Sequence, residues 1–260
     1  MPETRFADVR RFESIDSTNR YLLDEARGGA PEGVVAVADH QTAGRGRLGR
    51  SWEAPAGANL LLSVLLRPAI EPGERHLATA AVALAAVDAI GQAGITGVSI
   101  KWPNDLVDPT GRKLAGVLAE ADLTPGSVAG QAPPVVVGIG INVNWPESDR
   151  DLPPELAGRA ASVRQLAGAP LDRDELLEGI LACMEARVAD LATPAGRGRL
   201  ARDLLAACST VGTRVRVDLP DGSFEGTATG ISPEGHLVVD TGGGSRTVVA
   251  GDVVHVRPGS

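Results

Sequence analysis

The sequence predicts an α+β protein of 260 residues, in which a larger mixed domain precedes a small all-β domain. Up to residue 208, short apolar runs typical of buried strands alternate with segments whose apolar residues recur at helical spacing. From Gly212 onward, short strand-like runs are separated by Gly, Pro and Asp, a pattern typical of a compact β-barrel of about 45 residues. We therefore expect one domain over residues 1–208 and a second over residues 212–260.

The expected elements follow in chain order. Ser17 can cap the first helix, and Gly28 and Gly29 can end it. The helices are expected at residues 19–26, 74–93, 162–166, 173–191 and 199–208. The strands of the larger domain are expected at residues 9–14, 34–38, 59–66, 98–101, 106–107, 113–122 and 134–142, with a turn at 108–111. The strands of the small domain are expected at residues 214–219, 224–231, 236–241, 246–250 and 253–256.

Composition excludes several classes of protein. The 33 acidic residues outnumber the 25 basic ones and give a net charge of −8, which argues against a general nucleic-acid binder. Residues 1–13 carry charges where a secretion signal needs an apolar core, and no apolar run approaches the roughly 20 residues that span a bilayer. The two cysteines, Cys183 and Cys208, lack metal-ligand spacing. We expect a cytoplasmic protein with no membrane or nucleic-acid partner.

Lysine is scarce in this chain, since Lys101 and Lys113 are its only lysines and all its other basic residues are arginines. An ammonium group is a compact point charge, whereas a guanidinium is a wide planar fork, so the two are not interchangeable in a tight site. The scarcity makes both lysines candidates for function.

Residues 44–52 form a glycine-rich segment that formally matches the dinucleotide-binding pattern G-x-G-x-x-G. That pattern requires a helix after it, and here another strand follows, so we reject the dinucleotide fold. What remains is a loop in which Arg45, Arg47 and Arg50 can neutralise phosphate or carboxylate. A solvated basic loop is the alternative. A similar string at residues 196–200, just before a helix, shows that the pattern alone is weakly specific.

Two further segments carry one lysine each. Residues 101–106 read Lys-Trp-Pro-Asn-Asp-Leu and place Asn104 and Asp105 just after a strand, where a sheet holds side chains still. A simple Asn-Asp turn is the alternative. Lys113 opens the otherwise buried strand-like run at 113–120, so it must be paired or face a cavity. The alternative is a lysine that protects the edge of a strand.

The remaining candidates are less specific. Gly138 and Gly140 alternate within a strand, which indicates close approach of a ligand or of another backbone, and tight strand packing is the alternative. The Ser-Thr-Asn triplet at residues 17–19 is most simply a helix cap, and Gln41 is most simply a surface amide. The four histidines have no metal-ligand spacing.

Taken in order, these segments resemble the biotin protein ligase family over most of residues 9–166. The resemblance implies a central mixed or antiparallel sheet flanked by helices, of the class II synthetase-like type, and an SH3-like barrel at the C-terminus. It also implies the monofunctional form, because the catalytic pattern starts too near Met1 to leave room for an N-terminal DNA-binding domain. The segments that match are residues 17–19, Gln41, 44–52, 101–106, 113–116 and 138–142.

The resemblance implies an ATP-dependent ligase. Biotin carboxylate attacks the α-phosphorus of ATP to give biotinyl-adenylate, and the ε-amine of a lysine on a carrier then takes the biotin. Two anions must meet in the first step, so cations must screen them. The implied catalytic residues are Lys113, Arg45 and Asp105, of which Asp105 accepts the proton of the incoming amine. The implied biotin-binding residues are Ser17, Thr18, Asn19, Gln41, Arg45, Gly46, Arg47, Lys113 and Gly116. The implied ATP-binding residues are Arg47, Arg50, Trp52, Lys101, Asn104, Asp105 and Asn142. The resemblance also implies that Trp145 and the polar stretch up to Arg159 cover the adenine.

The resemblance also implies the ligands and partners. The substrates are ATP and biotin, and Mg²⁺ is held mainly by the ATP phosphates rather than by a protein metal site. Acceptor lysines in the family lie between methionines, and neither Met1 nor Met184 is beside a lysine, so the acceptor is expected on a separate protein. We expect the biotin carboxyl carrier domain of an acyl-CoA carboxylase as that partner, and a monomer or weak homodimer. A lipoate–protein ligase of the same fold is the alternative, although residues 44–52 and 101–106 fit the biotin pattern more closely.

Overall fold

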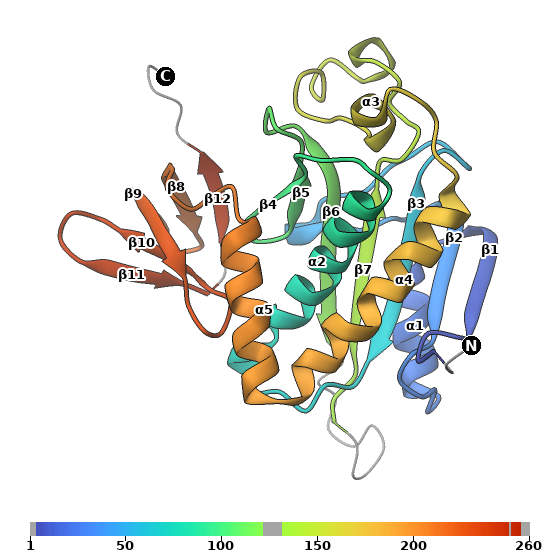
Figure 1. Cartoon of the computed structure of the whole chain (residues 1–260), viewed down its shortest axis with the longest axis horizontal. Helices are drawn as coiled ribbons and strands as arrows, with labels where there is room; N and C mark the ends of the chain where they lie inside the picture. The colour runs from blue at the N-terminus through green and yellow to red at the C-terminus, as the bar shows by residue number, and fades with distance from the viewer. Residues whose placement is uncertain (1–3, 122–131, 250, 256–260) are drawn as a thin grey trace.

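A computed structural model of the chain describes residues 4–121, 132–249 and 251–255. Within these ranges the strands form a seven-stranded sheet and a separate five-stranded sheet, with helices packed on the larger one (Figure 1). The strands of the larger sheet are β1 (Val9–Ile15), β2 (Val35–Gln41), β3 (Leu60–Leu66), β4 (Ser99–Lys101), β5 (Asp105–Val107), β6 (Lys113–Ala121) and β7 (Val135–Ile141). The helices are α1 (Thr18–Arg27), α2 (His76–Gln92), α3 (Val163–Ala167), α4 (Arg173–Ala189) and α5 (Pro194–Ala207).

The larger sheet has the strand order β1-β2-β3-β7-β6-β5-β4. The pair β1 and β2 is parallel, and the other neighbouring pairs are antiparallel. The predicted α+β class with a mixed central sheet is confirmed.

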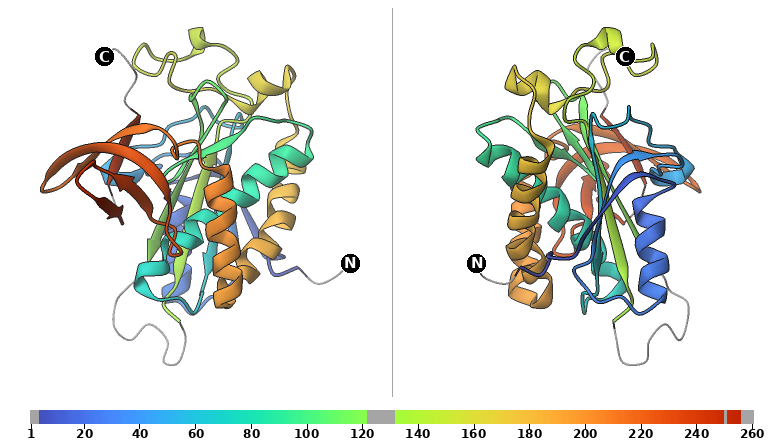
Figure 2. Two further views of the ribbon diagram at one scale, coloured as in Figure 1. Left: turned by 60° about the vertical axis from the view of Figure 1, so that its left-hand side comes forward. Right: turned by 90° about the vertical axis from the view of Figure 1, so that its right-hand side faces the viewer.

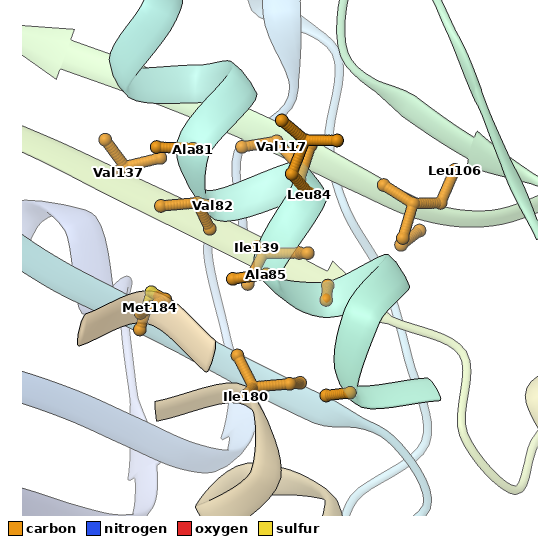
Figure 3. Close-up of a cluster of buried hydrophobic side chains, with 14 of the residues drawn as sticks. Ala81, Val82, Leu84, Ala85, Leu106, Val117, Val137, Ile139, Ile180 and Met184 are labelled. Carbon is orange, nitrogen blue, oxygen red and sulfur yellow. The ribbon is translucent and has the colours of Figure 1, made fainter. Parts of the chain in front are cut away.

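Helices cover both faces of this sheet. Helix α1 lies on one face, whereas α2, α4 and α5 lie on the other (Figure 2). Helix α2 is buried along nearly its whole length because it lies between the sheet and α4. Figure 3 shows this core, where α2 meets the sheet and α4, and its labelled residues are Ala81, Val82, Leu84, Ala85, Leu106, Val117, Val137, Ile139, Ile180 and Met184.

The alternation of side chains along β7 places its two glycines on the sheet face that carries α1. In β7, Val137 and Ile139 point to the α2 side, so Gly138 and Gly140 point to the α1 side. Val136, on that same side, packs against α1. The glycines have no side chain, and this leaves room on the sheet face beside α1 for side chains from other elements.

The C-terminal strands form a five-stranded antiparallel sheet of order β11-β10-β9-β8-β12. Its apolar side chains pack around Trp102, which belongs to the loop after β4, and the Trp102 indole donates a hydrogen bond to Gly235 O at 3.1 Å. This tryptophan therefore fixes the small sheet beside the ends of β4 and β5. The strands are β8 (Arg214–Leu219), β9 (Gly222–Ile231), β10 (Leu237–Asp240), β11 (Ser245–Val248) and β12 (Asp252–His255).

Two predicted helix starts were wrong by two or more residues. The last helix begins at Pro194 rather than at residue 199, because Thr193 caps it by accepting a hydrogen bond from Gly196 N and proline suits the first helical position. The long helix begins at His76 rather than at residue 74, after a short 3₁₀ turn at Pro72–Glu74. Asp122, Ala250 and Val256, at the ends of predicted strands, lie outside the described residues.

His76 lies where α2 meets Trp102 and His236, and we expect it to make the stability of the protein depend on pH. Burial, together with the charges of His236 and Arg47, lowers the pKa of His76 from 6.5 to about 4. Between pH 6.5 and pH 4 the unfolded chain therefore binds one more proton at His76 than the folded chain does. The contribution of His76 to the free energy of unfolding is complete above pH 6.5 and is lost as the pH falls toward 4. A shift of this size is worth roughly 3 kcal/mol.

The variant His76→Phe keeps the ring and removes the titration. We expect it to lose less unfolding free energy than the wild type between pH 7 and pH 4.5, measured by urea unfolding. Equal losses in the two proteins would show that His76 is not the responsible group.

Candidate active site

A cavity of about 430 Å³ opens on the α1 side of the central sheet. Its volume lies within the range of pockets for small ligands and cofactors. Its walls come from the start of α1, the glycine-rich residues 44–52 (the glycine loop), the segment 101–105, the strands β3, β6 and β7, and β12 of the C-terminal sheet. Segments that are far apart in the sequence thus contribute to one hollow.

The cavity is cationic although the whole chain is acidic. Among the described residues, six basic side chains line it and only Asp105 and Asp252 oppose them. The basic residues are Arg45, Arg47, Arg50, Lys101, Lys113 and Arg159. Such a concentration of positive charge suits a site in which two negatively charged groups must be brought together.

The polar end of the cavity is a chain of short hydrogen bonds. Gln41 Oε1 accepts from both the amide and the hydroxyl of Thr18, at 2.8 and 3.0 Å. The Thr18 hydroxyl lies 2.7 Å from that of Ser63, which in turn lies 2.6 Å from Asn19 Oδ1. Thr18 and Asn19 are therefore not merely part of a helix cap, and Gln41 is not a free surface amide. Ser17 does act as the N-cap of α1.

This series of hydrogen bonds has fewer donor protons than oxygen–oxygen contacts, so we call the polar end of the cavity its proton-poor end. The Asn19 amide donates to Leu118 O and to Glu120, so its Oδ1 must face Ser63. Each hydroxyl carries one proton, so the hydroxyls of Thr18 and Ser63 supply two protons to three oxygen–oxygen contacts. One acceptor is left over, and a ligand with N–H donors would satisfy it.

The structure also explains the alternating glycines of β7. A Cβ on Gly138 would lie 2.1 Å from Asn19 Oδ1, and one on Gly140 would lie 2.6 Å from the Trp52 ring. Both glycines are therefore required by side chains that wall the cavity rather than by another backbone, and both glycines line the cavity themselves.

Lys113 lies at the centre of the charged end. Its Nζ is 2.6 Å from Asp105 Oδ1 and 5.5 Å from the centroid of the Trp52 ring. Trp52 Nε1 is buried and has no hydrogen-bond partner within the described chain. The lysine thus faces the cavity with one carboxylate partner, as the cavity interpretation of its sequence position predicts.

The three arginines of the glycine loop all turn toward the cavity and hold protein partners there. Arg45 pairs with Glu120 at 3.1 Å, and Arg50 pairs with Asp252 of the C-terminal sheet. Arg47 donates to Asn104 Oδ1 and to Gly251 O, both at 3.2 Å, and burial lowers its pKa. The loop is therefore not a freely solvated basic segment.

Among the residues predicted to be catalytic or to bind biotin or ATP, Asn142 alone is absent from the described lining of this cavity. It is buried behind it, where its amide donates to Ala161 O at 3.0 Å and to Lys113 O at 3.4 Å. Trp145, expected to help cover the adenine, is also absent from the lining, whereas Arg159 is part of it. The other predicted site residues all line the cavity: Ser17, Thr18, Asn19, Gln41, Arg45, Gly46, Arg47, Arg50, Trp52, Lys101, Asn104, Asp105, Lys113 and Gly116.

Sequence reasoning missed two polar contributors to the walls, as well as the apolar residues Leu62, Val253 and Val254. Ser63 could have been found, because it is the one polar residue in the strand Leu-Leu-Leu-Ser-Val-Leu-Leu and it is fully buried. Asp252 gives no such signal, since only the folded chain brings β12 to the loop at Arg50.

Comparison with known proteins identifies the family. Residues 11–142 match the sequence profile of the Biotin/lipoate A/B protein ligase family, and residues 210–256 match the profile of the Biotin protein ligase C terminal domain. The chain belongs to the biotin/lipoate A/B protein ligase family.

Individual members of the family are similar over most of the chain. It is 39% identical to the Biotin--[acetyl-CoA-carboxylase] ligase of Mycobacterium tuberculosis over 93% of its length and 86% of that protein. It is 36% identical to the Bifunctional ligase/repressor BirA of Bacillus subtilis over 92% of its length and 71% of that protein. The biotin protein ligase of Aquifex aeolicus in complex with biotin and ATP superimposes with a TM-score of 0.80 at 27% identity, covering 97% of this chain and 100% of that one.

Proposed function

We propose that this chain is an ATP-dependent biotin protein ligase. It joins the carboxylate of biotin to AMP, with release of pyrophosphate, and passes the biotin to the ε-amine of a lysine on a carrier domain of an acyl-CoA carboxylase. The observation that carries this proposal is the convergence of both lysines and all three loop arginines on the cavity that holds the Gln41–Thr18–Ser63–Asn19 chain. The carboxylase ligase from Mycobacterium tuberculosis supports the choice of carrier.

The two ends of the cavity suit the two ends of biotin. The ureido ring has two N–H donors, which suit the proton-poor end at Thr18 and Ser63, whereas the dithiolane of lipoate has none. The biotin carboxylate then extends toward Lys113, which with Arg45 and Arg47 screens it from the α-phosphate of ATP. Arg50, Trp52, Lys101 and Asn104 border the space left for the nucleotide.

Mg²⁺ fits this site only as a companion of ATP. The described residues contain no group of three or more His, Cys, Asp or Glu side chains that could hold a metal ion. Asp105 offers one carboxylate, and Mg²⁺ is often bound through one or two carboxylates together with substrate phosphates. Mg²⁺ would there neutralise the charge of the phosphates.

Asp105 is a candidate for the second step as well as a partner of Lys113. Its carboxylate lies at the cavity wall, where the amine of a carrier lysine must enter, and it could take the proton of that amine.

We propose further that the five-stranded sheet is an SH3-like barrel within a domain at residues 212–260, and that residues 1–208 form the catalytic domain. We also propose that the enzyme acts in the cytoplasm as a monomer or weak homodimer.

No helix in the part of the chain that the structure describes is long and apolar enough to cross a membrane.

Incubation of the purified protein with ATP, Mg²⁺ and a biotin carboxyl carrier domain tests the proposed function. With biotin we expect a mass gain on the carrier equal to one biotinyl group, and with lipoate in place of biotin we expect none. A carrier in which the acceptor lysine is replaced by arginine is the control and should stay unmodified. Modification by lipoate but not by biotin would overturn the assignment.

A further inference from the structure

Glu120 lies just outside the cavity but contacts two of the residues that line it. Its Oε2 accepts a hydrogen bond from Asn19 Nδ2 at 2.8 Å, and its Oε1 accepts one from Arg45 Nη1 at 3.1 Å. Asn19 belongs to α1 and Arg45 to the glycine loop, whereas Glu120 is on β6. One carboxylate therefore ties the wall of the cavity to the loop that borders it.

At Asn19 the carboxylate and Leu118 O together determine which way the amide faces. A carboxylate only accepts hydrogen bonds, so the NH₂ group of Asn19 must point to Glu120 and its Oδ1 must point to Ser63. This orientation creates the proton-poor end of the cavity. A neutral amide at position 120 could donate as well as accept, and only Leu118 O would then still favour this orientation of Asn19.

At Arg45 the same carboxylate limits where the guanidinium can lie. The Glu120 and Arg45 side chains are 26% and 45% exposed, so the ion pair itself is worth about 0–1 kcal/mol. It occupies Nη1 of a group that has five N–H donors, and the remaining donors stay available to a ligand. The Glu120–Arg45 ion pair thus orients the guanidinium of Arg45 more than it stabilises the folded protein.

We propose that Glu120 is a positioning residue for the ligase reaction, which acts through Arg45 on retention of the adenylate and through Asn19 on recognition of biotin. The proposal rests on the proposed function. Neither role requires Glu120 to touch the ligand. A positioned Arg45 would hold the acyl-phosphate inside the cavity until the carrier lysine arrives, which limits loss of the reactive adenylate to water.

The variant Glu120→Gln tests this with almost no change in volume. We expect it to release or hydrolyse bound biotinyl-adenylate about tenfold faster than the wild type, a coupling within the range for residues in contact, and to raise the KM for biotin. Adenylate is followed by rapid filtration after a single turnover without carrier. Glu120→Asp, which keeps the charge but withdraws it from both partners, should also retain adenylate less well than the wild type.

A double-mutant cycle with Arg45→Ala separates positioning from a merely structural role. In the Arg45→Ala background, Glu120→Gln should leave adenylate retention unchanged, because its partner is already gone. Glu225→Gln is the matched control, since it removes an exposed Glu–Arg pair at 3.0 Å on the C-terminal sheet and should leave retention unaltered.

The outcomes are distinct. A wild type that forms no biotinyl-adenylate would overturn the proposed function itself. A wild type that forms and retains it, beside Glu120→Gln and Glu120→Asp variants that retain it equally well, would overturn the role of Glu120 alone. An equal effect of Glu120→Gln with and without Arg45 would also contradict the proposal.

Discussion

Lys113→Ala is expected to slow biotinyl-adenylate formation by about 10²- to 10³-fold, the usual effect of removing a group that stabilises developing charge. Lys113 is the lysine that lies 2.6 Å from Asp105 inside the cavity. In the proposed function, its ammonium is the compact cation that the carboxylate of biotin and the α-phosphate of ATP share. Release of pyrophosphate in the presence of biotin, ATP and Mg²⁺ measures this step.

The fold should survive this substitution, because the partly exposed Lys113–Asp105 pair is worth only about 0–1 kcal/mol. Thermal unfolding of the variant provides that control. Lys113→Arg should restore little activity, since a planar guanidinium does not replace a compact ammonium beside Trp52. Pyrophosphate release at the wild-type rate in Lys113→Ala would exclude the lysine from the chemistry.

Gly138→Ala is expected to weaken biotin binding by about 10- to 100-fold, although it adds a single methyl group. The new Cβ would lie 2.1 Å from Asn19 Oδ1, so Asn19 must move and its bonds to Ser63 and Glu120 must break. Ureido N–H donors that are left without their acceptors in the complex cost about 1–3 kcal/mol each, which corresponds to this loss of affinity. Isothermal titration calorimetry with biotin measures it.

Gly230→Ala is the matched control for this prediction. Gly230 also lies in a strand, β9, but a Cβ there would meet no heavy atom within 4 Å. It should bind biotin as the wild type does. If Gly138→Ala binds biotin equally tightly, Asn19 is not a part of the biotin site.

Most of the fold could be predicted from the sequence because local patterns determine it. The strand at Arg214–Leu219 was predicted at its observed bounds, and the helix over residues 19–26 differs from α1 by one residue at each end. The pairing order could not be predicted, since it depends on contacts between distant strands. The return of β7 to the centre, between β3 and β6, is one such arrangement.

Most residues of the site could be predicted from the sequence, but the hydrogen bonds and ion pairs between them could not. The scarcity of lysine singled out Lys101 and Lys113, and both line the cavity. Asn142 also belongs to a matching segment, yet its amide faces Ala161 because the chain has already passed the end of β7. The contacts of Arg45 with Glu120 and of Arg50 with Asp252 join residues that only the folded chain brings together.

A crystal structure of the protein with biotinyl-adenylate would test most directly whether the lysines and the loop arginines serve one acyl-adenylate site. We predict that the phosphate or acyl oxygens lie about 3 Å from Lys113 Nζ and from the guanidinium of Arg45 or Arg47, with the ureido ring beside Thr18 and Gln41. An adenylate bound elsewhere, or bound here with its acyl-phosphate remote from Lys113, would contradict the account.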